Sequence, residues 1–125
     1  MKVTNAEEQI YAKYEKNMRQ NEDALIGIRK KKENLERQED ELYTIKVQSH
    51  RYIEEQREIY AGTHEFDRIN RLDDNIHELT EISRKLLDKE YEELEKEEKR
   101  LYTQQEKHYE EYQSELRAYY NKEDN

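Results

Sequence analysis

Apolar side chains recur at steps of three, four and seven residues along almost the whole chain, the spacing of one face of an α-helix. In the first half they are Ile10, Tyr14, Met18, Leu25, Ile28, Leu35, Leu42, Ile45, Tyr52 and Ile59. In the second half they are Phe66, Ile69, Leu72, Ile76, Leu79, Ile82, Leu86, Leu94, Leu101, Tyr109, Tyr112, Leu116 and Tyr119, with a register slip between Leu87 and Leu94. The pattern predicts one long helix in each half.

The stretch REIYAGTHEFDRIN, residues 57–70, interrupts this pattern near the midpoint with Tyr60 and Gly62 as its turn motif. Glycine readily takes the left-handed conformation that ends a helix, and Thr63 is suited to cap the next one. Glu65 and Asp67 would lie near the positive end of that helix's dipole. We therefore predict helices over residues 5–60 and 65–121, reversed by a turn at 61–64.

The predicted stripes are narrow because polar residues interrupt them, at Lys32, Glu39, Ser49, Asp73 and Glu97. Such a stripe is typical of a coiled-coil seam, so the expected fold is all-α: a single antiparallel two-helix coiled-coil hairpin over residues 1–125. Burial of about twenty seam side chains stabilises the fold by about 2 kcal/mol each. This sum is small beside the entropic cost of ordering the whole chain. The stripes should therefore also face a second molecule, through Ile28, Leu35, Leu42, Phe66, Leu79, Leu101, Tyr109 and Tyr112.

An alternative interpretation is one continuous helix that pairs in parallel with itself, as a self-associating structural coiled coil. Composition is compatible with helix in either case. The chain is 44% charged and 32% hydrophobic, which can indicate disorder, but it has no Pro and only two Gly. Gly27 is then a tolerated glycine inside a helix, or a point of close helix approach.

No Cys is present, and the first residues lack the apolar core of a secretory signal. No apolar run is long enough for a membrane span, so no membrane insertion is expected. We expect a cytoplasmic chain that would leave the cell, if at all, without a cleaved signal peptide and together with its partner.

The net charge of −9 is uneven, at −1 over residues 1–62 and −8 over residues 63–125. A polyanion such as DNA would be repelled by the second half. The basic cluster RKKK, residues 29–32, precedes Glu33 and Glu36 and is interpreted as a solvated helix face, with a nucleic-acid accessory role as the alternative.

Candidate chemistry is sparse. Asp74 and His77 have the spacing of carboxylate-bridged di-iron bundles, but no second such pair has an apolar surround. No glycine-rich phosphate loop or nucleophile elbow occurs. The sequence therefore predicts no metal, no cofactor and no enzymatic activity.

Tyrosines crowd the end of the chain, at Tyr102, Tyr109, Tyr112, Tyr119 and Tyr120. They could fill the helix–helix seam where its edge stays in contact with water. Tyrosine is also enriched where proteins meet partners, because it covers apolar area while its hydroxyl stays hydrated.

Two long helices reversed by Tyr60-Ala61-Gly62 resemble the WXG-motif proteins of type VII secretion systems, with Tyr in place of Trp. The chain is more similar to the small helical proteins encoded beside LXG-domain toxins, called Lap proteins. The resemblance lies in LIGIRKKKENLERQEDELY (25–43), HRYIEEQREIYAGTHEFD (50–67) and EELEKEEKRLYTQQEKHY (92–109).

This resemblance implies a targeting factor that packs against the helical LXG region of a toxin, with a second small helical protein as a further partner, and assists its export. Related export substrates carry a Tyr-x-x-x-acid signal after the second helix. Tyr119 with Glu123, and Tyr120 with Asp124, match that signal in spacing and location.

Overall fold

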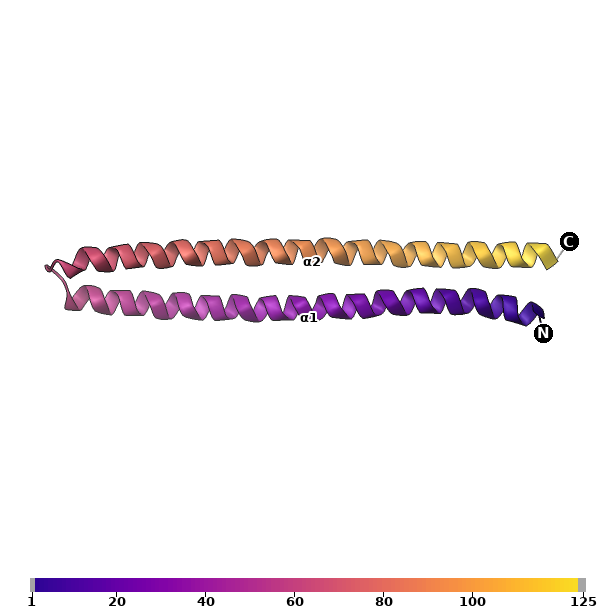
Figure 1. Cartoon of the computed structure of the whole chain (residues 1–125), viewed down its shortest axis with the longest axis horizontal. Helices are drawn as coiled ribbons and strands as arrows, with labels where there is room; N and C mark the ends of the chain where they lie inside the picture. Colours follow the sequence, from indigo (N-terminus) through magenta and orange to yellow (C-terminus); the bar gives the residue numbers. More distant parts are fainter. Residues whose placement is uncertain (1, 124–125) are drawn as a thin grey trace. The chain divides into compact units, whose positions relative to one another are not determined.

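The computed structural model describes residues 2–123 and consists of two helices, α1 over Lys2–Ile59 and α2 over Glu65–Glu123 (Figure 1). Within residues 2–123 there is no strand. The predicted all-α helical hairpin is confirmed, and the alternative of one continuous helix is wrong because the chain reverses after Ile59.

The reversal depends on Gly62, whose φ of 77° lies in the left-handed region. A residue with a Cβ is strained there, whereas glycine is not. The expected role of Thr63 as the side-chain cap of α2 is wrong. Its hydroxyl instead donates to the carbonyl oxygen of Tyr60 at 2.7 Å, so Thr63 closes the end of α1. Its carbonyl oxygen accepts from the amide of Phe66 at 3.2 Å, which starts the first turn of α2.

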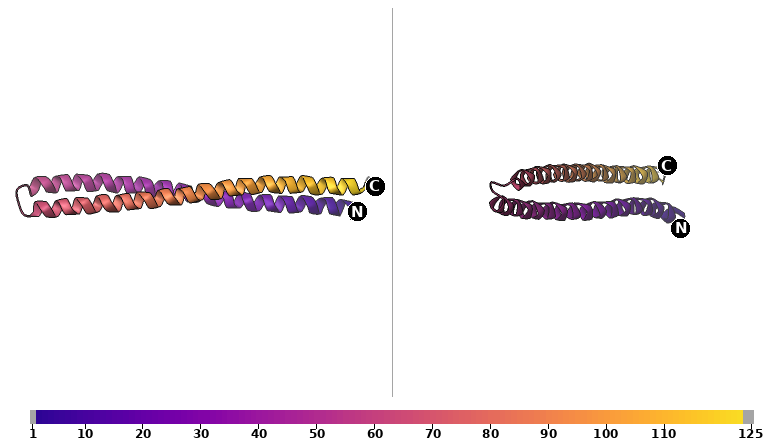
Figure 2. Two further views of the ribbon diagram at one scale, coloured as in Figure 1. Left: turned by 90° about the horizontal axis from the view of Figure 1, so that it is seen from above. Right: turned by 60° about the vertical axis from the view of Figure 1, so that its left-hand side comes forward.

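The chain divides into two compact units. Each unit contains a stretch of α1 and a stretch of α2 that lie side by side (Figures 1 and 2). The turn unit is Lys32–Glu93, and the terminal unit pairs residues 2–31 with residues 94–123. Within the turn unit, Arg57 on α1 bonds Asn70 and Asp73 on α2. Within the terminal unit, Lys13 bonds Glu115 and Asn21 bonds the Leu101 carbonyl. Rising numbers on α1 meet falling numbers on α2, so the helices are antiparallel in each unit.

Each unit has a thin core in which few apolar side chains are fully covered. Leu35, Ile53 and Ile69 are buried in the turn unit, and Ile28 and Leu101 in the terminal unit. Two helices have only one shared seam, so most other side chains remain in contact with water.

We predict that Gly27→Ala stabilises the chain. Gly27 lies inside α1 with a helical backbone, and a Cβ added there would meet no atom within 4 Å, so it is a tolerated glycine and not a point of close approach. Removing the flexibility of glycine from a helix should raise the free energy of unfolding by about 0.5–1 kcal/mol. Thermal unfolding followed by circular dichroism measures the change.

The matched control is Gly62→Ala, which should lower stability by about 1 kcal/mol because of the positive φ at that position. Equal effects of the two substitutions would contradict the assignment of the two glycines.

Candidate helix-binding surface

Two rows of exposed apolar side chains run along the turn unit at steps of seven residues. On α1 the row is Ile45, Tyr52 and Ile59, and on α2 it is Leu72, Leu79 and Leu86, with Ile82 beside them. Each of the seven residues is between 43% and 66% exposed. A residue spacing of seven keeps a row on one side of a helix.

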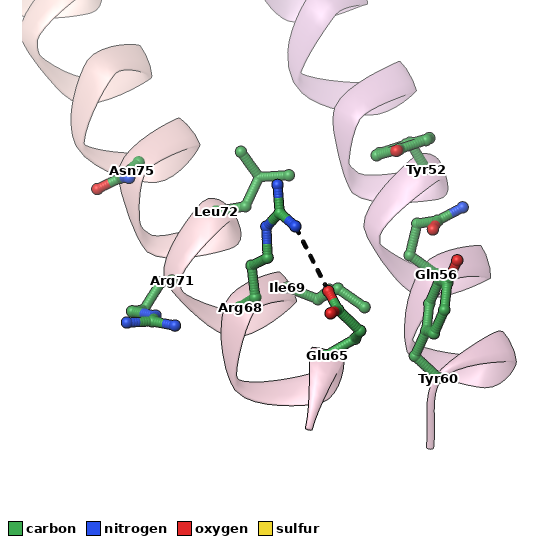
Figure 3. Close-up of a pocket in the computed structure, with 9 residues that line it drawn as sticks. All are labelled: Tyr52, Gln56, Tyr60, Glu65, Arg68, Ile69, Arg71, Leu72 and Asn75. Atoms are coloured by element: carbon green, nitrogen blue, oxygen red, sulfur yellow. Dashed lines mark ion pairs between the residues drawn. The ribbon is translucent and has the colours of Figure 1, made fainter. Parts of the chain in front are cut away.

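Two grooves show that the rows lie on the same side of the turn unit. One groove, of about 550 Å³, has Tyr52 from α1 and Leu72 from α2 among its lining residues (Figure 3). A second, of about 340 Å³, has Ile45 from α1 and Leu86 from α2 in its lining. We call this side, with the seven residues above, the apolar face.

Figure 3 shows Tyr52, Gln56 and Tyr60 along α1 facing Ile69 and Leu72 of α2 across the first groove. Near the turn, Arg68 pairs with Glu65 at 3.6 Å on the α2 side of this groove. The groove is therefore lined by apolar and polar side chains in similar measure, with the Glu65–Arg68 pair near the turn.

A network of ionic groups links the helices near the turn. Arg57 donates to Asp73 Oδ2 at 2.8 Å and to Asn70 Oδ1 at 3.2 Å, and it also pairs with Glu54. His77 Nε2 lies 3.4 Å from the other oxygen of Asp73, whose side chain is only 14% exposed. A carboxylate this covered needs such partners, and the network ties α1 to α2 at one register.

Further from the turn, a groove of about 300 Å³ is lined by Tyr43 and Lys46 of α1 and by Thr80, Glu81 and Arg84 of α2. The Arg84 guanidinium bonds Glu81 at 3.0 Å and lowers the pKa of that carboxyl below its ordinary value. None of these residues lines either groove of the apolar face. Tyr43 is exposed, but its neighbours in this groove are mostly charged or polar.

The sequence pattern predicted a single apolar stripe on each helix. In the structure, the residues of that stripe divide between the buried seam and the exposed apolar face. Ile53, which the predicted stripe omits, has an exposed fraction of 0%, whereas its neighbour Tyr52 is half exposed. Neighbouring positions differ because a helix advances about 100° per residue, so the seam and the apolar face divide the residues between them.

The residues predicted to bind a partner fall into three groups. Ile28, Leu35 and Leu101 are buried in the hairpin's own seam and offer no surface to a second molecule. Leu42, Phe66 and Tyr112 are half-buried. Leu79 and Tyr109 are exposed, and Leu79 is the middle residue of the α2 row.

Tyrosines of the terminal unit pack against one another between the helices. Tyr14 stacks on Tyr112 with ring centroids 4.5 Å apart, and Tyr11 and Tyr109 make edge contacts of 6.3 Å with Tyr112 and Tyr14. Aromatic pairs of this kind contribute about 0.5–1.5 kcal/mol beyond the area that they bury. Of the five tyrosines near the end of the chain, Tyr112 and Tyr119 are half-buried, whereas Tyr102, Tyr109 and Tyr120 are about half exposed.

The residues of the predicted export signal lie at the end of α2. The Tyr120 hydroxyl donates to Glu7 Oε1 at 2.7 Å, and its ring lies 5.4 Å from that of Tyr119. Glu123 is the last residue of α2, and Asp124 lies outside the described residues.

A buried polar residue of the terminal unit was missed by sequence reasoning. Asn21 is buried, and its side-chain amide donates to the Leu101 carbonyl at 3.1 Å. Asn21 lies seven residues before Ile28, so the heptad spacing could have identified it as a seam residue. A buried Asn on a helix seam helps to set the register of the two helices.

Over residues 2–123 no group of three or more His, Cys, Asp or Glu side chains is placed to hold a metal ion. His77, considered above for a di-iron motif, contacts Asp73 instead. Among the helices described, neither is apolar enough over a sufficient length to cross a membrane.

The chain matches no protein-family model, no curated protein and no solved structure.

We predict that Ile53→Ala lowers the free energy of unfolding by about 2–4 kcal/mol, because it leaves a cavity at a fully buried position. Ile45→Ala makes the same chemical change on the apolar face and should cost less than about 1 kcal/mol. Urea unfolding at low protein concentration measures both. Similar losses of stability in the two variants would contradict the assignment of Ile53 to the seam and Ile45 to the apolar face.

Proposed function

We propose that this chain is a non-enzymatic helical binding protein, and that its turn unit takes up helices of a partner protein on the apolar face. The observation that carries the proposal is the two rows of exposed apolar residues on one side of that unit. Exposed apolar residues gathered on one side of a protein, unlike single scattered ones, often mark interaction sites.

The spacing of the rows favours a helical partner. Side chains repeating every seven residues on two antiparallel helices form a groove that matches the apolar stripe of another helix. The grooves between the rows also contain Ile69, which is buried, and Leu87, which is half-buried. A helix pair laid on this face would complete a second seam.

The partner that we propose is the helical LXG region of a toxin, together with a second small helical protein. Support comes from the Tyr60-Ala61-Gly62 reversal and from the resemblance to proteins encoded beside such toxins. The chain would act as a targeting factor in the cytoplasm, and would assist export through a type VII secretion system or leave with its cargo.

A self-associating protein without a secretion role would use the same face, and remains the second candidate. Because both candidate functions use the same face, the oligomeric state of this chain does not distinguish them. The assay therefore has to measure binding of a different protein chain.

We predict that the chain co-purifies with the LXG region encoded nearest to its own gene when the two are co-expressed. Leu79→Glu should weaken that complex by about 100-fold or more, because it places a carboxylate at the centre of an apolar contact. A pull-down followed by titration calorimetry measures the loss.

The matched control is Tyr43→Glu, an equally exposed position that lines neither groove of the apolar face, which should retain the complex. Failure of the wild-type chain to capture the LXG region, or equal loss in the two variants, would refute the proposal. Circular dichroism confirms that both variants keep their helix content.

A further inference from the structure

The two grooves of the apolar face differ in the charges that line them. The first groove has Glu65, Arg68 and Arg71 in its lining, so it carries both signs. The charged residues that line the second are Glu41 on α1 and Glu90 on α2, and no lysine or arginine among the described residues lines it. Of these two grooves, the second alone presents a single sign of charge to an occupant.

Four aliphatic side chains, two from each helix, line the second groove between these carboxylates. They are Leu42, Ile45, Leu86 and Leu87. Ile45 is 54% exposed and Leu86 is 58% exposed, whereas Leu42 and Leu87 are half-buried. An occupant of this groove would therefore cover aliphatic side chains and meet a carboxylate on each helix.

Neither carboxylate has an ion-pair partner in the part of the chain described. Glu41 and Glu90 are both exposed. Lys85 and Lys89 precede Glu90 on α2, but they line neither groove of the apolar face. Both negative charges are thus available to a molecule that enters the second groove.

The register of the turn unit places the two carboxylates near the same level. Arg57 bonds Asn70 and Asp73, so antiparallel counting puts Glu41 level with residues 86–89. Glu90 then lies at most about 6 Å farther along the helix axis, at about 1.5 Å per residue. A short stretch of one helix laid in the groove can therefore reach both.

We propose that the second groove binds a stretch of the partner's helix in which apolar side chains alternate with lysine or arginine. A long basic side chain lays its aliphatic stem on apolar surface while its charged head stays in water. Such heads would pair with Glu41 and Glu90, whereas an acidic stretch would be repelled. The inference rests on the proposed function and adds the chemistry by which this face selects a partner helix.

The overall charge of the turn unit is a separate source of attraction for basic molecules. Residues 32–93 carry 10 Lys and Arg against 18 Asp and Glu, a net of −8. Salt screens charges beyond about 8 Å at physiological ionic strength, whereas the proposed pairs would be in contact. The test has to separate the two carboxylates of the groove from this overall charge.

The first test compares three synthetic peptides of about three heptads, each cross-linked to stay helical. One has leucine on its apolar stripe with flanking lysines, the second has flanking glutamates, and the third has the composition of the first with the stripe scrambled. At physiological salt the full chain should bind the first at least about 10-fold more tightly than either other peptide. Fluorescence anisotropy measures the three dissociation constants.

The second test neutralises the groove with Glu41→Gln and Glu90→Gln together. This variant should bind the lysine peptide about 10-fold more weakly than the wild type and should bind the glutamate peptide more tightly. The matched control is Glu39→Gln with Asp88→Asn, which also removes one charge from each helix, at positions that line neither groove of the apolar face. The control should change the affinity for the lysine peptide by less than about 2-fold.

Equal losses in the two double variants would overturn the proposal, because the overall charge would then explain the preference. Equal binding of the lysine and glutamate peptides by the wild type would overturn it as well, and so would equal binding of the scrambled peptide. Circular dichroism checks that both double variants keep their helix content.

The two proposals fail separately. A chain that selects the lysine peptide through Glu41 and Glu90 but captures no LXG region removes only that partner. A chain that captures the LXG region through Leu79, but binds the lysine and glutamate peptides equally, removes only the selection by charge.

Discussion

Two helices that pack only on each other share a single seam, and every other feature of this structure depends on that limit. The seam covers a few aliphatic side chains completely, among them Ile53 and Leu101. The remaining apolar residues have no third element to cover them within the described units. Their exposure follows from the architecture, because two helices bury side chains only along their single shared interface.

Most of the exposed apolar residues of the turn unit belong to the apolar face, although Tyr43 lies in a separate, mostly charged groove. Tyr52, Leu72 and Leu86 line the grooves of that face, while charged groups such as Arg57 and Asp73 link the helices through specific bonds. The two kinds of contact have different roles. The ionic network and the buried Asn21 fix the register, and the apolar face holds the surface whose burial would release free energy on association.

Particular residues show where sequence reasoning succeeded and where it failed. Gly62 was predicted to reverse the chain, and it does so with a positive φ, because few other residues adopt that conformation without strain. Thr63 was expected to cap α2 but closes α1 instead, since its hydroxyl can satisfy either helix end and only the geometry of the turn selects one. Ile28 and Leu35 were predicted to face a partner and are buried in the hairpin's own seam.

Periodicity and composition by themselves determined that the chain is helical, that it reverses near Gly62, and that apolar side chains lie in heptad-spaced rows. Those properties depend on local backbone preference and on residue spacing, which are fully present in the sequence. Only the tertiary structure decided which rows enter the seam, leaving Ile53 covered and its neighbour Tyr52 on the surface. That choice depends on the rotation and register of one helix against the other, which are set jointly by contacts between residues far apart in the chain.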